Sequence, residues 1–263
     1  MSRKIHPTAI VAETAKIGEG AEIGPFCIVD GNVELGDGVR LISHVTISGH
    51  TKIGADTVIY PHASLGHPPQ DFKYKGEETW LKIGARNTIR EYVTMHPGTG
   101  VGRKETVIGD DGFFMVGTHV AHDCIVGDKV VLSNHAVLGG YCVVEDQVIL
   151  GGYTGVVQFC RIGRQAFVNA MSLLTKDVIP YGAVGGNHAH LEGLNLVGLR
   201  RRGHSRQAVK ELRTAYRLMF AEEGSFNERL VDVAGLYPEN PAVKEIIDFI
   251  RAEPKRSICM PHD

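Results

Sequence analysis

The segment HVAHDC holds side chains suited to acid–base chemistry, because His119 and His122 lie three residues apart and Asp123 follows directly. A neutral imidazole can accept a proton on one nitrogen while the other donates to a carboxylate, which fixes the tautomer and stabilises the imidazolium. His122 and Asp123 are therefore a candidate general base with its orienting group. Neighbouring residues of a strand face opposite ways, so Asp123 can reach His122 only where the chain turns back or across a subunit boundary.

The same residue types also suit zinc, which proteins hold with histidine, cysteine and carboxylate ligands. No third ligand with convincing spacing accompanies the pair, so we expect no metal. The cysteines are scattered without a CxxC pair, which argues against a zinc knuckle or a disulfide framework. We expect five buried free thiols: Cys27, Cys124, Cys142, Cys160 and Cys259.

Two further features could serve a ligand. Gly140, in LGGYCVV, could let the backbone approach a ligand and aim its N–H at a developing negative charge, although a sharp corner would also require glycine. The stretch GLRRRGHSR (198–206) carries four arginines near an expected helix start, where they could bind phosphate. The same arginines could grip an acidic protein partner or form a solvated charged face.

A six-residue period in the sequence must position these residues. Apolar residues recur at every sixth position in three runs, with Val101 ending the second and a phase shift before Ile108. The runs are Ile5, Val11, Ile17, Ile23, Val29, Leu35, Leu41, Ile47, Ile53, Ile59 and Leu65; Ile83, Ile89, Met95 and Val101; and Ile108, Phe114, Val120, Val126, Leu132, Leu138, Val144, Leu150, Val156, Ile162, Val168 and Leu174. Amphipathic helices would require spacings of three and four. The period predicts short strands joined by sharp turns, three to a coil, in a left-handed parallel β-helix.

Breaks in the register mark loops, since insertions in a solenoid can only leave as loops. The segment 66–80 contains two prolines and the only tryptophan, and a shorter break lies near 99–106. Loops on a rigid scaffold commonly build binding sites, so the long loop is a candidate site. The register stops at Pro180.

The C-terminal part has helical periodicity instead. Ser205 is a plausible N-cap for a first helix, a second is predicted over 225–234, and Pro241 is expected to start a third. We therefore divide the chain into a β-helix domain, 1–191 with loop 66–80, and a helical domain, 192–263.

Composition excludes several classes of protein. With a formal net charge of -2, no global basic field points to nucleic acid. No apolar run is long enough to span a bilayer, and the N-terminus lacks the apolar stretch of a signal peptide. We expect no integral membrane segment and a cytoplasmic location.

Several motifs together resemble one family, the UDP-N-acetylglucosamine O-acyltransferases of lipid A biosynthesis, over roughly residues 3–220. They are HPTAIV, IGPFCIV, SHVTISGHTKIG, QDFKYKGE, HVAHDCIVGD, QFCRIG, GNHA and GLRRRG. The resemblance implies transfer of a 3-hydroxyacyl chain from acyl carrier protein to the 3-position of a UDP-N-acetylglucosamine-type sugar nucleotide, the first step of lipid A biosynthesis. It also implies a homotrimer with active sites between neighbouring β-helices, and no cofactor besides the two substrates.

The resemblance also assigns residue roles. It implies His122 as general base, Asp123 as its orienting group and the Gly140 amide as the donor to the thioester oxyanion. Residues implied to contact the sugar nucleotide or the acyl-pantetheine chain are Asp71, Lys73, His119, Gln158, Asn195 and Arg201. The implied mechanism is direct transfer without a covalent enzyme intermediate.

Three positions depart from the family pattern. The family typically has histidine at Tyr141, and often a second histidine at Val157 and a glutamate at Val197. Either the acceptor is altered, for instance to a 3-amino-3-deoxy sugar nucleotide that would yield an amide, or the chain is a diverged relative with weak or different activity.

The acyl-length region also differs, because Asn169, Ala170 and Met171 stand where the family commonly has a glycine-rich run. A pocket narrowed by these side chains predicts an acyl chain no longer than the family's common medium lengths.

Two alternatives remain open. One is a hexapeptide acetyltransferase that uses acetyl-CoA, against which the QDFKYKGE loop argues. The other is a non-catalytic scaffold or sugar-nucleotide binder.

Overall fold

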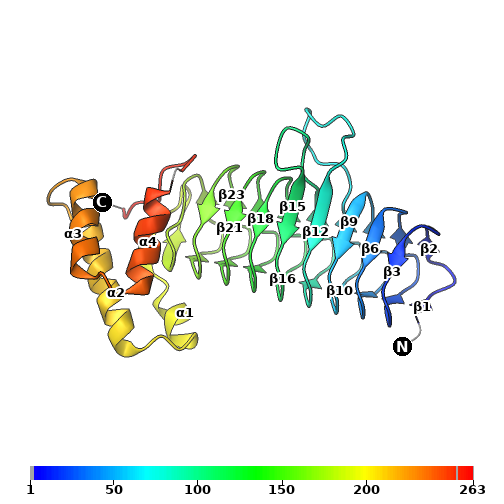
Figure 1. Ribbon diagram of the computed structural model, residues 1–263, viewed down its shortest axis with the longest axis horizontal. Helices are drawn as coiled ribbons and strands as arrows, with labels where there is room; N and C mark the ends of the chain where they lie inside the picture. The colour runs from blue at the N-terminus through cyan, green and yellow to red at the C-terminus, as the bar shows by residue number, and fades with distance from the viewer. Residues whose placement is uncertain (1–2, 253, 263) are drawn as a thin grey trace.

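The computed structural model describes residues 3–252 and 254–262. The chain winds through three sheets in turn and ends in a group of helices at one end of the resulting prism (Figure 1). All strand pairs between coils are parallel, except that β27 and β28 pair antiparallel at the last turn. The mainly β fold predicted from the hexapeptide period, a left-handed parallel β-helix, is confirmed.

The strands are short because each coil must turn three times. Sheet A contains β1 (Lys4–Ile5), β4 (Glu22–Ile23), β7 (Arg40–Leu41), β10 (Val58–Ile59), β13 (Thr88–Ile89), β16 (Phe113–Phe114), β19 (Val131–Leu132), β22 (Ile149–Leu150), β25 (Phe167–Val168), β27 (Gly182–Gly185) and β28 (His190–Leu194). Sheet B contains β2 (Ile10–Val11), β5 (Ile28–Val29), β8 (Thr46–Ile47), β11 (Ser64–Leu65), β14 (Thr94–Met95), β17 (His119–Val120), β20 (Val137–Leu138), β23 (Gly155–Val156) and β26 (Leu173–Leu174). Sheet C contains β3 (Lys16–Ile17), β6 (Val33–Leu35), β9 (His50–Ile53), β12 (Trp80–Ile83), β15 (Glu105–Ile108), β18 (Ile125–Val126), β21 (Val143–Val144) and β24 (Arg161–Ile162).

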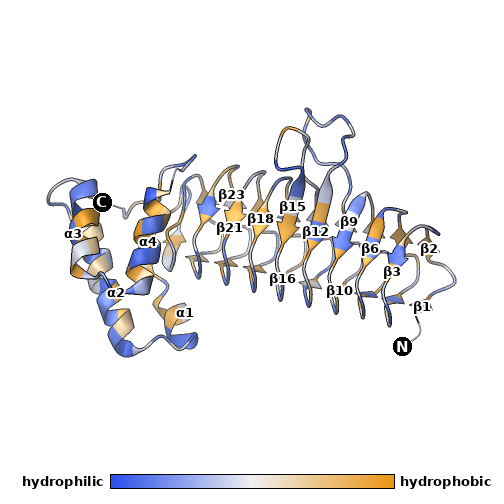
Figure 2. Ribbon diagram, viewed as in Figure 1, coloured by the Kyte–Doolittle hydropathy of each residue, from blue (hydrophilic) through white to orange (hydrophobic). Residues whose placement is uncertain are grey.

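The repeated aliphatic positions form the core. Ile47, Ile59 and Leu132 are fully buried, and the second residue of nearly every strand points inward in the same way. Figure 2 shows the result as apolar positions that alternate with polar ones along the strands. Ile5 is an exception at 47% exposed, because the first coil has no coil beneath it.

Two details of the predicted register are wrong. Val101 is 67% exposed and lies in a loop, so the inner column passes from Met95 to Thr106 and Ile108 without it. The coil also continues past Pro180, because β27 pairs with β25 in parallel register. Pro180 stands at the sixth position after Leu174, so the aliphatic period ends at this residue in the sequence. Proline lacks an N–H but can precede a strand, and β27 begins two residues later.

The three corners of the prism differ in what they carry. We name them AB, BC and CA after the sheets that they join in chain order. Both insertions leave at corner BC, since 66–79 runs from β11 to β12 and 96–104 runs from β14 to β15. The two loops project together from the same side of the prism in Figure 1. These loops lie outside the packed coils, so corner BC is the candidate location of the functional site.

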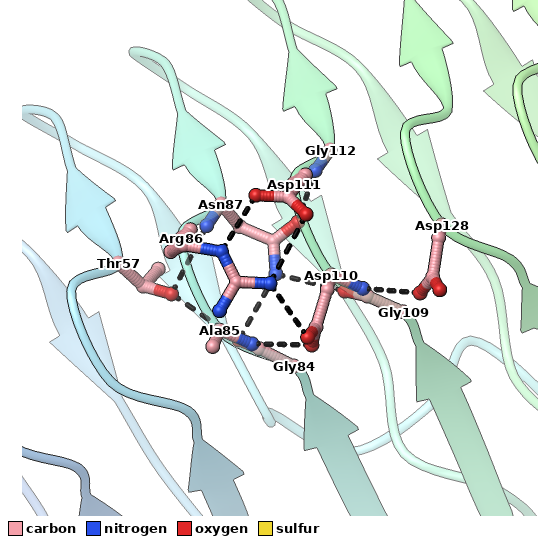
Figure 3. Close-up of polar contacts among 10 residues, drawn as sticks. All are labelled: Thr57, Gly84, Ala85, Arg86, Asn87, Gly109, Asp110, Asp111, Gly112 and Asp128. Atoms are coloured by element: carbon pink, nitrogen blue, oxygen red, sulfur yellow. Dashed lines mark hydrogen bonds and ion pairs between the residues drawn. The ribbon is translucent and has the colours of Figure 1, made fainter.

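Corner CA satisfies its own polar groups. The Asp110 carboxylate accepts from the Ala85 N–H at 2.7 Å, and that of Asp128 accepts from the Asp110 N–H at 2.7 Å, one coil apart (Figure 3). The buried Asn87 amide donates to the carbonyls of Gly84 and Gly109 at 3.0 and 2.9 Å. These bonds lock successive coils together and leave few groups free for a ligand.

Four helices are described in residues 196–251. α2 (Arg206–Met219) begins after the N-cap Ser205, α3 (Phe226–Leu236) after the N-cap Ser225, and α4 (Pro241–Arg251) starts at proline, as predicted. The sequence did not indicate α1 (Leu196–Arg201), a single short turn-and-a-half capped by Asn195. The division at 191/192 stays a prediction, and β28 crosses it. No helix in the described part of the chain is long and apolar enough to cross a membrane.

Candidate active site

His122 and Asp123 follow β17 at corner BC. Asp123 adopts φ 59°, a left-handed conformation that reverses its side chain toward His122. The Nδ1 atom of His122 lies 2.8 Å from Oδ2 of Asp123. The corner therefore turns Asp123 back within the same chain, which is one of the two routes that the sequence left open.

The Asp123 carboxylate is fully buried and held by the short loop 96–104. It accepts from the N–H and hydroxyl of Thr99, at 3.1 and 2.7 Å, and from the N–H of Arg103 at 2.6 Å. Burial alone would raise the pKa of Asp123, but the hydrogen bonds from His122, Thr99 and Arg103 outweigh it and lower the pKa. An ionised carboxylate only accepts, so Nδ1 of His122 carries a proton and Nε2 is left to take one.

Gly140 lies one coil beyond His122 and faces its ring. A Cβ added to Gly140 would stand 2.7 Å from Cε1 and 2.8 Å from Nε2 of His122, so only glycine leaves the imidazole in this position. Among residues 3–252 and 254–262, no acceptor is found for the Gly140 N–H. The rings of Tyr141 and His122 meet edge to face, with centroids 5.3 Å apart at 87°. A backbone amide without an acceptor in the described chain thus lies close to an accepting nitrogen.

The long loop brings a carboxylate to that space. Oδ2 of Asp71 lies 3.9 Å from Nε2 of His122. The N–H of Lys73 donates to Oδ1 of Asp71 at 2.9 Å, which orients the carboxylate. The Lys73 side chain is exposed and makes no ion pair with any described residue. Loop 66–80 therefore contributes one negative and one positive group beside the candidate base.

Two further histidines lie beside His122: His119, which the sequence predicted, and His96, which it missed. We call His96, His119 and His122 the histidine wall. Nδ1 of His119 lies 2.7 Å from the Thr94 hydroxyl, and the His96 and His119 rings meet edge to face at 4.9 Å. Burial, then the neighbouring His119 and His122, lowers the pKa of His96 to about 4. Its Nδ1 is buried without a partner among the described residues. The register contained the signal, because His96 follows Met95, which pairs with Val120 beside this site.

Gln158 continues the same corner one coil beyond Gly140, and its side chain is exposed. His122, Gly140 and Gln158 therefore form a row along corner BC. Val157, directly before Gln158 in the chain, is half-buried against the core. The structure thus brings seven of the predicted site residues to one corner: Asp71, Lys73, His119, His122, Asp123, Gly140 and Gln158.

Asn195 and Arg201 lie elsewhere on the chain. They line a cavity of about 600 Å³ between the outer face of sheet A and α1, together with Val197. The Asn195 amide donates to the Gln165 carbonyl at 3.0 Å, and its oxygen caps α1 by accepting from Gly198 at 2.9 Å. These residues do not meet His122 within one chain.

The three acyl-length candidates lie at corner AB, at the opposite end of the sheet B strands from His122. The Asn169 amide donates to the Glu192 carboxylate at 2.5 Å. Ala170 and Met171 are exposed, Met171 at 72%. No described contact joins them to the histidine wall.

The arginine run is placed differently from our expectation of a helix start. Arg200 and Arg201 lie in the last turn of α1, at the negative end of its dipole, and only Arg206 begins a helix. Cations are favoured at that end. Basic side chains gather instead around a cavity of about 720 Å³ lined by Arg200, His204, Arg206, Val209, Lys210, Arg213, Thr214 and Arg217.

The described cysteines are free and buried, as predicted. Within residues 3–252 and 254–262, no group of three or more histidine, cysteine, aspartate or glutamate side chains is arranged to hold a metal.

Known proteins share this architecture along nearly its whole length. A family model described as "Udp N-acetylglucosamine O-acyltransferase; Domain 2" matches residues 177–259, and one described as "Bacterial transferase hexapeptide (six repeats)" matches residues 14–49. The acyl-[acyl-carrier-protein]–UDP-N-acetylglucosamine O-acyltransferase of Caulobacter vibrioides is 56% identical over 257 residues, which are 98% of this chain and 98% of the relative. The chain belongs to this acyltransferase family.

Other members support the assignment. The enzyme of the same name from Rhizobium johnstonii is 45% identical, over 99% of this chain and 96% of its own. A solved UDP-N-acetylglucosamine O-acyltransferase from Moraxella catarrhalis superposes with a TM-score of 0.94 at 44% identity, covering 97% of this chain and 99% of that chain. The resemblance drawn from the motifs is thus confirmed, and the protein is an acyltransferase. The roles of its individual residues stay predictions.

Proposed function

We propose that the protein moves a 3-hydroxyacyl chain from acyl carrier protein to the 3-position of UDP-N-acetylglucosamine, the first step of lipid A biosynthesis. One observation carries the proposal. In a chain of this family, Nε2 of an oriented His122 lies beside Gly140 at corner BC, and the Gly140 amide has no acceptor in the described chain. Acyl transfer to a hydroxyl requires this pair, a base for the incoming proton and a donor for the oxyanion.

The proposed mechanism is direct transfer. The 3-hydroxyl oxygen attacks the thioester carbonyl as its proton passes to Nε2 of His122. The Gly140 N–H donates to the oxyanion, and Asp123 stabilises the imidazolium. Collapse breaks the carbon–sulfur bond, and the departing thiolate takes the proton from His122. No covalent enzyme intermediate and no cofactor is needed. Asp71, Lys73 and His119 flank the acceptor, and Gln158 the donor.

The residues on sheet A lead us to propose that each site is shared by two chains. Asn195 and Arg201 lie on a different face from His122, so one chain alone cannot place all of them on one sugar nucleotide. A ring in which corner BC of one chain meets the outer face of sheet A of the next would do so, and a heterologous interface forms such a ring when its rotation closes. We propose the homotrimer.

Such a ring would point corner AB toward its axis. This corner carries a column of exposed residues with left-handed backbone, several in ring contact at about 5 Å: Phe26, His44, His62, Tyr92, His135, Tyr153 and Met171. Exposed aromatic side chains in one row are typical of protein interfaces. The column supports the trimer and gives it a place to pack.

We propose that the acyl tail crosses the outer face of sheet B toward this axis. Val137 is 40% exposed there, and Gly155 and Leu173 follow on the next two coils. Gly155 has no side chain to obstruct this path, and a Cβ there would lie 3.5 Å from Cδ1 of Leu173. Met171 stands at the far end. Each methylene that packs along this path adds about 0.8 kcal/mol of burial, so binding strengthens until the tail reaches Met171. A path that ends there favours medium chains.

The basic cavity beside α2 suits the donor protein. It gathers Arg200, Arg206, Lys210, Arg213 and Arg217 at one end of the β-helix. Complementary charge steers association and fixes orientation, so an acidic carrier protein would be drawn to this face. The cytoplasmic location expected from the sequence stays a prediction.

A second acceptor is supported by Tyr141. Its ring packs edge to face with His122, at a position where the family typically has another histidine. An amine nucleophile needs different hydrogen-bonding partners from a hydroxyl, so a 3-amino-3-deoxy sugar nucleotide is the alternative acceptor, with an amide as product.

A panel assay tests both. The purified protein is incubated with 3-hydroxyacyl carrier-protein thioesters of several lengths, or with acetyl-CoA, and each of the 3-hydroxy and 3-amino sugar nucleotides. Mass spectrometry then identifies products. We expect an ester on UDP-N-acetylglucosamine from the carrier-protein thioesters. An amide from the amino sugar alone would shift the assignment to the second acceptor, and no product from any pair would contradict both.

A further inference from the structure

The chain beyond α4 folds back onto the β-helix. The N–H of Asp177 donates to the Ser257 carbonyl at 2.8 Å, and the N–H of Cys259 donates to the Asp177 carbonyl at 2.7 Å. A further bond joins Leu191 to the Met260 carbonyl at 2.9 Å. Figure 1 shows this end of the chain beside the last coils. The segment 254–262, which we call the strap, is thus fixed across the last coils, from corner BC at Asp177 to β28 at Leu191.

The strap carries two cations to the row of active-site residues. Nε of Arg256 donates to the Gln158 carbonyl at 3.0 Å. Nζ of Lys255 lies 4.8 Å from the centroid of the Phe159 ring. Phe159 in turn stacks on Tyr141 at 4.7 Å. Because Tyr141 packs on His122, an unbroken line of contacts runs from the strap to the candidate base.

A third cation lies at the end of the same row. Lys176 occupies the corner position that follows Gln158 by one coil, and its carbonyl accepts from Sγ of Cys259 in the strap at 3.9 Å. Lys176, Lys255 and Arg256 make no ion pair with any residue in the described ranges. The Asp177 carboxylate, which adjoins Lys176 in the chain, is buried and already paired with Arg161 at 2.7 Å. No ion pair within the described ranges therefore neutralises these three cations.

The spacing fits one part of the donor. From His122 to Lys176 the row advances by three coils, or about 14 Å at the usual spacing of neighbouring strands. In a phosphopantetheine arm, the sulfur and the phosphorus are separated by about thirteen bonds, equal to a little over four residues of extended chain, or about 15 Å. With the thioester at His122 and Gly140, the phosphate would reach the strap.

We propose that Lys176, Lys255 and Arg256 bind the phosphate of the donor's 4′-phosphopantetheine arm, so that the C-terminal strap is part of the donor site. The inference rests on the proposed function for the identity of the donor. Lysine and arginine are suited to a phosphodiester, and a site at the end of the row would hold the arm extended along corner BC. Arg256 also ties the strap to Gln158, so its position depends on the coil that flanks the arm.

Direct binding tests the proposal without relying on turnover. Calorimetry measures the affinity of the intact protein for two thioesters, a 3-hydroxyacyl-phosphopantetheine and the same compound without phosphate. We expect the phosphate to tighten binding about tenfold, as charge-assisted hydrogen bonds do. In the Lys176→Gln/Lys255→Gln variant the two affinities should become equal, with affinity for the dephosphorylated compound unchanged. Both lysine side chains are exposed, so the fold should survive, whereas substitution of Arg256 would also loosen the strap.

A matched control and a second ligand separate the possible outcomes. Lys129→Gln removes one exposed lysine at corner CA and should leave the tenfold ratio intact. The UDP-sugar is the second ligand, because its diphosphate is the other phosphate group that this protein would meet. Its affinity should not change in the double variant. A ratio that survives in the double variant would overturn the proposal, and so would a loss confined to the UDP-sugar. Failure of the proposed function would be seen separately, as no transfer by the unaltered protein from acyl carrier protein.

Discussion

Replacing Gly140 with alanine should disable the site without unfolding the protein. The new Cβ would stand 2.7 Å from Cε1 and 2.8 Å from Nε2 of His122. Carbon atoms in contact normally stay about 3.5 to 4.0 Å apart, so one of the two groups must move by about 1 Å. Backbone at this corner is tied to the next coil by the bond from the Phe159 N–H to the Gly140 carbonyl at 3.0 Å, so the imidazole is the group that moves.

The magnitude follows from that displacement. A shift of about 1 Å would stretch the 2.8 Å bond between His122 and Asp123 beyond hydrogen-bonding range. Misplacement of a catalytic group by about 1 Å can cost about a hundredfold in rate, which is about 2.7 kcal/mol of transition-state stabilisation. The Gly140→Ala variant should therefore have about one hundredth of the normal kcat. Its KM for the sugar nucleotide should change little, because the substitution does not touch the side chains of loop 66–80.

Steady-state kinetics with acyl carrier protein thioester and UDP-N-acetylglucosamine measure the effect, and thermal unfolding checks the fold. Gly235→Ala is the matched control, since a Cβ at that helical position meets nothing within 4 Å. It should keep full activity and gain a little stability. A folded Gly140→Ala protein with kcat within threefold of normal would refute the account of this corner.

Four further results are expected. Asp123→Asn should lower kcat about a hundredfold or more, because an amide cannot accept from all the donors that hold the carboxylate. The His122→Ala and Arg201→Ala variants should each be inactive alone. When the two chains are co-expressed, about a quarter of normal activity should return, because a shared site is complete only where a chain that keeps His122 is followed by a chain that keeps Arg201. Leu173→Ala should shift the preferred acyl length upward by about two carbons in a competition assay of donor thioesters. Because burial and its histidine neighbours lower the pKa of His96 to about 4 from 6.5, the unfolded chain binds a proton between these values that the folded chain does not. The free energy of unfolding should therefore fall by up to about 3 kcal/mol as the pH falls through this window, and by less in His96→Asn, as urea titrations would measure.

The hexapeptide period predicted the fold well because every coil repeats the same physical requirement. One aliphatic side chain per face must fill the inner column, so the register could be counted without tertiary information. Val101 shows where counting fails. A valine at the right spacing could not be distinguished from a core residue in the sequence. In the structure it lies in the loop from which Thr99 and Arg103 donate to Asp123.

The site was only partly predictable for a different reason. HVAHDC placed the base and its carboxylate next to each other, but only the left-handed turn at Asp123 brings the two side chains together. His96 was overlooked because nothing local marks it, and only strand pairing places it beside His119. The strap could not be foreseen at all, since the contact between Arg256 and Gln158 joins residues 98 positions apart.

The most direct test of the central claim is the turnover of His122→Ala with 3-hydroxyacyl carrier protein and UDP-N-acetylglucosamine. General-base catalysis contributes about a hundredfold to ten-thousandfold, so kcat should fall by at least the lower figure. Size-exclusion chromatography and thermal unfolding should show the oligomer and its stability unchanged. Near-normal turnover by the folded variant would contradict the assignment of His122 as the base and, with it, the mechanism proposed for corner BC.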